Sequence, residues 1–214
     1  MMEAMAGRRI AWIALALVPL LCGADATRTM APPPSPKFAP PAHALFADDF
    51  SRDLSAWKPD RPGVWSLKNK TLRADLPDQK QVRSLIYAGD TTWTDYALDV
   101  DVCMTRGVDK GAVVRAQGEL GLGIDLRGGG YQDVVAYVRE WPVGKAPAVN
   151  ANATWNHVRI EVVGERFRVW VNGELKLDRK QSKARQGRIA LPAYTGGAGQ
   201  CTVYYDNVVV TAAR

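Results

Sequence analysis

Residues 155–173 read WNHVRIEVVGERFRVWVNG, and this stretch predicts two antiparallel strands joined by a tight turn. Apolar and polar residues alternate on both sides of Gly164-Glu165, so each half presents one apolar face. A two-residue turn at that dipeptide fixes one register for the hairpin. It pairs Val162 with Phe167, Ile160 with Val169 and Val158 with Val171 on the apolar face, and Glu161 with Arg168 and Arg159 with Trp170 on the other.

A second turn is expected at Asn172-Gly173, a dipeptide that favours two-residue hairpin loops. A strict two-residue turn places Leu175 and Leu177 on the face of Trp170, which should be polar. Two arrangements remain open. Either a β-bulge returns the leucines to the apolar face, or both faces of the sheet are partly covered.

The same pattern continues through residues 45–214, where short runs rich in Val, Ile, Tyr and Trp are separated by Gly, Asn, Asp and Pro. Only Asp53–Lys58 could form a single helical turn. The sequence therefore predicts an all-β fold, a two-sheet antiparallel β-sandwich or jelly roll. Strands are expected near residues 46–50, 63–67, 71–75, 83–88, 95–104, 111–116, 120–126, 132–140, 155–163, 166–171, 174–178, 187–191 and 201–211.

The N-terminus has the features of an export signal. A charged start is followed by the apolar run Ile10–Leu21, too short to cross a membrane, and by small residues at Ala24-Asp25-Ala26. We expect residues 1–26 to be a cleaved signal peptide, which predicts a secreted or periplasmic protein. Cys22 leaves an alternative open, because lipidation there would anchor the chain to a membrane.

A proline-rich segment, residues 27–44, separates this signal from the predicted domain, residues 45–214. Prolines restrict the chain to extended conformations, so we expect a semi-rigid spacer. The segment could equally be a disordered leader without a role of its own.

Composition excludes several classes of function. The chain has 214 residues and a formal net charge of +6, but its basic residues are dispersed, which argues against nucleic-acid binding. It has two histidines, no Cys-x-x-Cys pair and no Cys/His cluster, which argues against zinc. No phosphate loop, nucleotide fingerprint or Ser/His/Asp order is present, so we expect no cofactor apart from a possible structural calcium ion.

The order of several motifs resembles a known family. The motifs are Leu45–Phe50, Leu54–Trp57, Gly63–Leu67, Gly111–Arg115, Trp155–Ile160, Val169–Gly173, Gly187–Leu191 and Tyr205–Val208. This order is similar to concanavalin A-like jelly rolls of the 3-keto-disaccharide hydrolase branch (DUF1080), with laminin-G-like lectin modules as relatives. The resemblance implies either a carbohydrate-binding, cell-envelope module or a hydrolase or lyase acting on 3-keto-disaccharides or related glycosides.

The resemblance does not settle whether the protein is an enzyme. Arg115 matches the arginine-bearing strand of the family, but Asp109-Lys110 replaces the asparagine-serine pair often found before it. The Glu-x-Asp-x-x-Glu strand of the jelly-roll glucanases is also missing. Both departures favour the binding module.

Several side chains could supply acid–base chemistry, which in glycoside hydrolysis requires two carboxyl groups across the scissile bond. Asp99 and Asp101 point to the same face of their strand. Leu98 and its apolar neighbours occupy the opposite face, which should be the buried one, so we expect both aspartates on a solvated surface. His157 is expected to be structural. The better set is Glu119, Asp125, Asp133 and Glu140, which could also be ordinary solvated residues.

A ligand site is predicted where Gly128-Gly129-Gly130 turns one strand back on the next. The expected register pairs Ile124 with Val134, Leu122 with Ala136, Asp125 with Asp133, Gly123 with Val135, Gly121 with Tyr137, and Glu119 with Arg139. Two glycines on one face then leave a floor without side chains, on which a sugar could stack against an aromatic ring. The residues assigned to this site are Arg115, Gly121, Gly123, Asp125, Tyr137 and Arg139; alternatively, the glycines only ease sheet curvature.

Two further expectations depend on strand neighbours. First and last strands often pair in jelly rolls, which could bring Asp48, Asp49 and Asp206 together around calcium, although Asp206 could instead begin a bulge. Cys103 and Cys201 remain after signal cleavage, and two cysteines in an oxidising compartment suggest one bridge. The family fold implies that their strands pair antiparallel, so we expect them to be bonded.

Overall fold

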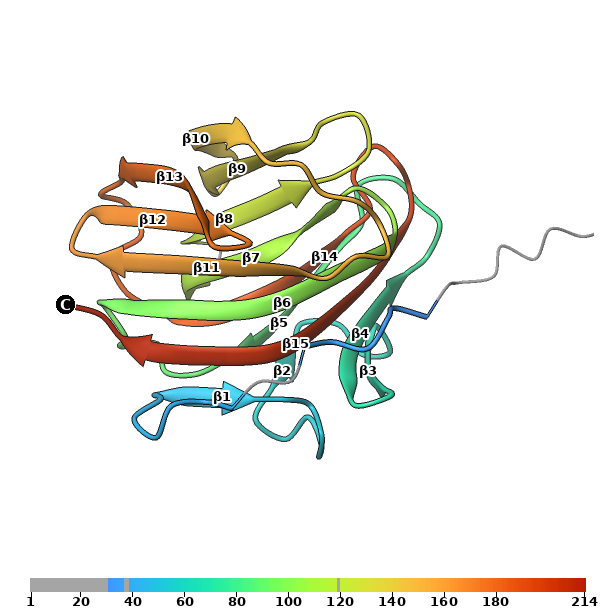
Figure 1. Cartoon of the computed structure of the whole chain (residues 1–214), viewed down its shortest axis with the longest axis horizontal. Helices are drawn as coiled ribbons and strands as arrows, with labels where there is room; N and C mark the ends of the chain where they lie inside the picture. The colour runs from blue at the N-terminus through green and yellow to red at the C-terminus, as the bar shows by residue number, and fades with distance from the viewer. Residues whose placement is uncertain (1–30, 37–38, 119) are drawn as a thin grey trace, which may run out of the picture.

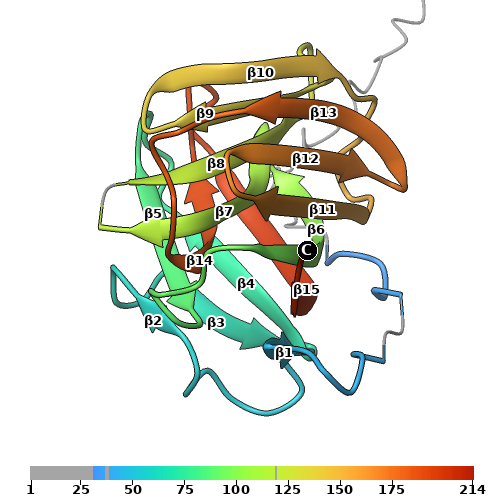
Figure 2. The same ribbon diagram turned by 90° about the vertical axis from the view of Figure 1, so that its left-hand side faces the viewer.

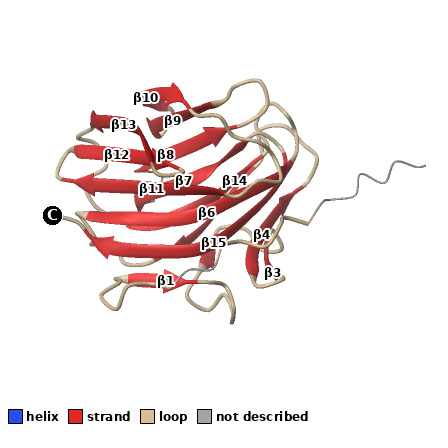
Figure 3. Cartoon of the chain, in the orientation of Figure 1, coloured by secondary structure: helices blue, strands red, loops and turns tan. Residues whose placement is uncertain are grey.

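The computed structural model describes residues 31–36, 39–118 and 120–214. These residues form strands, turns and loops and contain no helix (Figure 3). Two antiparallel sheets pack face to face with the apolar core between them (Figure 1), which confirms the predicted β-sandwich. None of the described segments is a helix long and apolar enough to span a bilayer.

Sheet A has the strand order β13-β12-β11-β6-β15-β4-β3, with β1 added beside β15. Its strands are β1 (Phe46–Asp48), β3 (Trp65–Lys68), β4 (Thr71–Leu76), β6 (Tyr96–Arg106), β11 (Asn156–Val163), β12 (Arg166–Val171), β13 (Glu174–Lys180) and β15 (Cys201–Ala212).

Sheet B has the order β10-β9-β8-β7-β14-β5-β2. Its strands are β2 (Lys58–Pro59), β5 (Arg83–Ala88), β7 (Asp109–Gln117), β8 (Leu120–Arg127), β9 (Asp133–Val138), β10 (Trp141–Pro147) and β14 (Arg188–Tyr194). The edge strands β10 and β13 lie next to each other, which brings the two sheets together along one side (Figure 2).

The hairpin of β11 and β12 has the predicted register at every predicted pair. Its apolar face enters the core, where Val158, Ile160 and Val169 are fully buried. At the next turn the pairing shifts between Val169 and Trp170, so the bulge alternative is confirmed. Leu177 thereby reaches the core, whereas Leu175 remains 48% exposed.

Three local expectations about the chain path were wrong. Strands β2 and β10 were not predicted; β10 contains two prolines and a glycine, which sequence reasoning assigns to turns. Asp53–Lys58 forms no helical turn; its backbone closes instead in a β-turn, in which the Trp57 amide donates to the Leu54 carbonyl.

The glycine-rich hairpin differs from its predicted register by two residues. Gly123 lies opposite Tyr137 and Asp125 opposite Val135, and the hairpin closes at Arg127 and Asp133. Two hydrogen bonds of 2.8 Å join the Arg127 guanidinium to the Asp133 carboxylate, which favours this closing pair. A shift of two keeps every side chain on its predicted face, so Ile124, Leu122, Val134 and Ala136 are still buried in the core.

The expected disulfide is absent. Of the cysteines that the structure describes, Cys103 and Cys201 are both buried and both free. Cys201 belongs to the core cluster, as do Val102 and Met104 on either side of Cys103. Because side chains alternate along a strand, Cys103 points to the other face of sheet A, away from Cys201. Neither the predicted signal peptide nor Cys22 lies within the described residues.

Arg115 is a structural residue of the fold rather than a ligand residue. It has a φ of 51° at a bulge of β7, and its side chain is 1% exposed. Nε donates to the Thr94 carbonyl (2.7 Å), and Nη1 donates to the Gly164 and Ala184 carbonyls (2.7 and 3.2 Å). Nη2 lies 3.0 Å from the Asp95 carboxylate. The predicted role of Arg115 beside the glycine floor is therefore wrong.

Replacing Arg115 with methionine should lower the free energy of unfolding by about 3–5 kcal/mol, because it removes a buried cation and leaves its carbonyl partners without donors. Urea unfolding followed by tryptophan fluorescence would measure the change. The matched control is Arg166→Met, which breaks an exposed ion pair with Asp178 and should leave the free energy of unfolding nearly unchanged. Equal losses in the two variants would contradict the structural role of Arg115.

Candidate functional site

A row of polar side chains crosses the outer face of sheet B, one from each of five adjacent strands. Odd-numbered positions of β7, β8 and β9 face outward because their even-numbered neighbours lie in the core. The registers place Asp125 opposite Gly111 and Tyr194 opposite Arg83. We call this set the sheet B polar row; in strand order it consists of Tyr137, Asp125, Asp109, Tyr194 and Arg83.

Asp125 lies between Tyr137 and Asp109 in the row, and its carboxyl group has a raised pKa. Burial raises the pKa of its carboxyl group from the usual 3.8 to about 7, and the nearby charge of Asp109 adds to this effect. A hydrogen bond from the Tyr137 hydroxyl opposes the shift. Near neutral pH the Asp125 carboxyl can therefore either donate or accept a hydrogen bond.

Asp109 is the second carboxyl group of the row. Burial raises its pKa, while the charge of Arg127 on β8 lowers it. Its carboxylate packs against Gly196, where an added Cβ would come within 2.5 Å of Asp109 Oδ2. The residue at position 196 has a φ of +51°, so glycine suits both the backbone and the close contact.

Tyr137 lies over a glycine. A Cβ on Gly123 would come within 2.6 Å of Tyr137 Cε2, so only glycine leaves room for the ring in this position. The predicted bare floor is thus filled by the aromatic ring itself, and a Val113 methyl similarly occupies the space above Gly121. The Tyr137 side chain is half-buried on the outer face of the sheet and does not enter the core.

Of the predicted ligand residues, the structure brings Asp125, Tyr137 and Gly123 together. Arg139 does not join them, because β9 ends at Val138 and Arg139 lies in the exposed turn before β10.

The predicted acid–base set is not a cluster in the structure. Asp133 is buried in ion pairs with Arg127 and Lys145 that lower the pKa of its carboxyl, and Glu140 lies in the exposed turn after β9. The side chain of Glu119 lies outside the described residues. Asp125 alone of this set belongs to the sheet B polar row.

His157 is a bridge between two aspartates on the outer face of sheet A. Its Nδ1 lies 2.8 Å from Asp101 Oδ1 and its Nε2 lies 3.1 Å from Asp99 Oδ1. Both carboxylates raise its pKa to about 9, so the ring is a cation at neutral pH, which fits the expected structural role. Asp101, expected on a solvated surface, is only 5% exposed.

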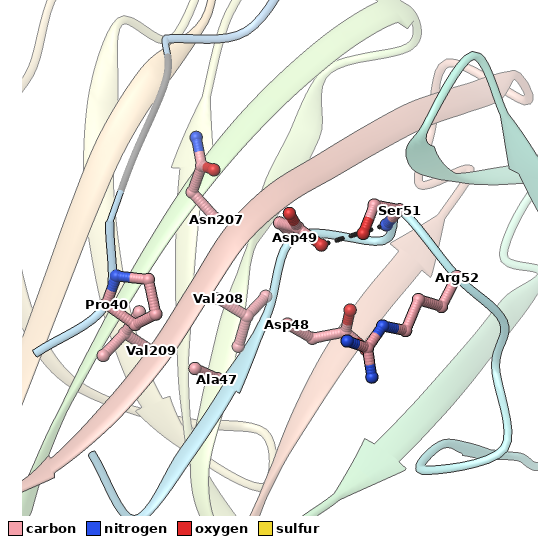
Figure 4. A pocket seen from close by; sticks show the side chains of 9 residues that line it. All are labelled: Pro40, Ala47, Asp48, Asp49, Ser51, Arg52, Asn207, Val208 and Val209. Atoms are coloured by element: carbon pink, nitrogen blue, oxygen red, sulfur yellow. Dashed lines mark hydrogen bonds between the residues drawn. The ribbon is translucent and has the colours of Figure 1, made fainter. Parts of the chain in front are cut away.

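The expected calcium site does not form. Strands β1 and β15 do pair, but Asp48 accepts hydrogen bonds from the Phe50 amide and the Trp57 indole, and Asp49 accepts from Ser51 (Figure 4). Among the described residues no three His, Cys, Asp or Glu side chains are placed to hold a metal ion.

Sequence reasoning missed Asp109, Tyr194 and Arg83 as site residues. The signal for Asp109 was its acidic character at a position where the family resemblance leads one to expect an amide or hydroxyl. No local sequence pattern indicated Tyr194 or Arg83. They lie near Asp109 because β14 lies between β7 and β5 in the sheet, and the sequence does not show that strand order.

The model of one protein family matches residues 42–211, and its description is 3-keto-alpha-glucoside-1,2-lyase-like domain. No curated protein matches the sequence.

Solved structures share the fold at low sequence identity. Carbohydrate-binding module CBM66 from Bacillus subtilis has a TM-score of 0.64 and 15% identity, over 75% of this chain and 98% of that one. A putative glycosyl hydrolase from Parabacteroides distasonis has a TM-score of 0.57 and 17% identity, over 78% and 98%. A protein of unknown function with a galectin-like fold from Bacillus subtilis has a TM-score of 0.63 and 9% identity, over 79% and 96%.

The raised pKa of Asp125 predicts a specific pH dependence of stability. Between about pH 4 and 7 the folded protein keeps a proton that the unfolded chain has released, so this group makes the free energy of unfolding fall as pH rises. Asp125→Asn removes the effect. The variant should therefore gain stability relative to wild type from about pH 4 up to pH 7, and the difference should stay constant at higher pH. Urea unfolding at several pH values would measure it, and a pH-independent difference would contradict the raised pKa.

Proposed function

Because the chain belongs to the 3-keto-alpha-glucoside-1,2-lyase-like domain family, we propose that it binds a carbohydrate on the outer face of sheet B. The observation that carries this proposal is the sheet B polar row. It combines a half-buried aromatic ring, two carboxyl groups, a second tyrosine and a guanidinium within one surface.

The chemistry of the row suits a sugar. The apolar face of a pyranose ring can stack on Tyr137, and the flanking polar groups can bond its hydroxyls. The carboxyl of Asp125 can serve a sugar hydroxyl as donor or acceptor, because its pKa is close to neutral pH. The solved carbohydrate-binding module of similar fold supports a binding role.

A second candidate function is elimination from a 3-keto-glycoside. The favouring observation is that Asp109 and Asp125 lie on adjacent strands and both have raised pKa values. The Asp109 carboxylate would remove the C2 proton, which the neighbouring ketone acidifies. The electron pair of that C–H bond would form the C1–C2 double bond and expel the C1 oxygen. The Asp125 carboxyl would give its proton to this leaving oxygen.

We also propose that the protein is exported, with residues 1–26 removed and lipidation at Cys22 as the alternative. The charged start, the short apolar run and the small residues at 24–26 support this proposal. In a Gram-negative host the product should fractionate with the periplasm or the medium and begin at Thr27. N-terminal sequencing checks this, and a mass increase from acyl chains on Cys22 would identify the lipoprotein instead.

Tyr137→Ala should weaken carbohydrate binding by about 10-fold or more, since it removes both the stacking surface and the hydrogen bond to Asp125. Gly123→Ala should weaken binding similarly, because the new methyl group would displace the ring. A glycan array would identify the sugar, and calorimetry would measure its affinity.

The matched control is Trp170→Phe, an aromatic change on the outer face of sheet A, which should leave the affinity unchanged. Circular dichroism would verify that each variant is folded. Wild-type affinity in folded Tyr137→Ala and Gly123→Ala would move the binding site away from the row.

The elimination would convert a 3-keto-glucoside into a conjugated enone, which absorbs in the ultraviolet. We expect Asp109→Asn and Asp125→Asn each to lower kcat by about 100-fold or more, as loss of a general acid or base does. Asp178→Asn, in the exposed ion pair with Arg166 on sheet A, is the control. If wild type releases no enone from methyl 3-keto-α-glucoside but still binds sugar, the elimination is contradicted and only the binding function remains.

A further inference from the structure

The proline-rich segment is seated on the domain rather than held away from it. Residues 31–36 run beside β15 on the side of sheet A (Figure 1). The Trp155 indole donates to the Pro33 carbonyl at 2.6 Å, and the Asn207 amide donates to the Pro36 carbonyl at 2.7 Å. Between these two anchor points the Ser35 hydroxyl donates to the Asp206 carboxylate.

These contacts have the chemistry needed to recognise a proline-rich chain. Proline has no backbone N–H, so such a chain offers mainly carbonyl acceptors, and it stays extended before it binds. A site that recognises it must supply donors for those carbonyls and an aromatic surface. Trp155 and Asn207 supply two donors, and their acceptor carbonyls lie three residues apart along the segment. Trp155 is also the aromatic residue at this site.

The domain holds Asn207 in place through contacts outside the proline-rich segment. With the segment seated, Asp206 and Asn207 are only 5% and 6% exposed. Asn207 has a φ of 51° in a bulge of β15. The Asn207 amide also donates to Asp101 Oδ2 at 2.7 Å, and the other oxygen of Asp101 is bonded to His157. The donor to the Pro36 carbonyl is thus fixed by a network that reaches β6 and β11.

The segment is only loosely packed against what lies beneath it. A cavity of about 580 Å³ separates residues 32–36 from the turn between β3 and β4 and from Asp49 and Ser51. Asn69, Lys70 and Thr71 are among the residues that line it. Polar bonds at a few points, rather than a filled apolar interface, hold the segment, so exchange for another chain would leave no packed core exposed.

We propose that Trp155, Asp206 and Asn207 form a binding site for extended proline-rich peptides, which residues 32–36 occupy in cis. It is separate from the proposed carbohydrate site, which lies on the outer face of sheet B. A proline-rich segment of another protein that displaces residues 32–36 would attach the domain to that protein.

The test follows the indole N–H of Trp155 by NMR in the full chain, with the signal assigned from Trp155→Phe. In wild type this proton should exchange with water at least about 10-fold more slowly than that of Trp141, which is 67% exposed. The variant Pro32→Gly/Pro33→Gly/Pro34→Gly/Ser35→Ala/Pro36→Gly, called the glycine-substituted variant, should lose this protection. Adding the acetylated peptide APPPSP in trans should restore it, whereas AGGGSG should not.

A second variant tests the proposed binding site itself. Asn207→Gly keeps the left-handed backbone favourable and removes the amide donor, so in the glycine-substituted background it should weaken peptide binding by calorimetry. Arg166→Met, remote from this binding site, should not weaken peptide binding. Equal exchange of the Trp155 proton in wild type and the glycine-substituted variant, or no response to APPPSP at millimolar concentration, would overturn the proposal. Either result is independent of sugar binding.

Discussion

A buried guanidinium joins the two sheets at one end of the sandwich. Arg115 belongs to β7 in sheet B. Its partners include the Thr94 carbonyl, just before β6, and the Gly164 carbonyl, in the turn between β11 and β12. The strands β6, β11 and β12 all belong to sheet A. The Arg115 amide donates to the Tyr96 hydroxyl at 2.5 Å, and that hydroxyl lies 3.1 Å from the Gly187 carbonyl. An arginine can satisfy this many carbonyls from one buried position because its donors spread in a rigid fork.

This constraint also shapes the candidate site. The bulge at Arg115 interrupts the pairing of β7 with both β8 and β14, and it turns the arginine away from the outer face of sheet B. That face carries the sheet B polar row instead, which contains two carboxyl groups and one guanidinium. The site therefore differs from the arginine-lined site that the sequence predicted, although two of its residues, Asp125 and Tyr137, are the same.

A strand register was predicted correctly where the turn residues allow one turn, and wrongly where they allow several. The dipeptide Gly164-Glu165 permits one short turn, and the register of its hairpin was correct throughout. Three consecutive glycines permit several loop lengths, so there the register depends on the Arg127–Asp133 pair, which no local pattern indicates. The disulfide prediction relied on strand adjacency and overlooked alternation, which places Cys103 and Cys201 on opposite faces. The site residues on β5 and β14 could not be predicted, because strand order in a jelly roll is set by the packing of distant segments.

The last strand of the sandwich, β15, lies in the middle of sheet A, between β6 and β4 and beside β1. Every other strand of that sheet is synthesised before β15. During translation, the edges of β6 and β4 that will pair with β15 are therefore unpaired, and another chain could pair with them. The sheet closes only after the strand has left the ribosome, and the fold belongs to the slow, high-contact-order class. A chain broken just before Cys201 would lose the centre of its sheet rather than an edge. Such a fragment is a natural substrate for chaperones and proteases.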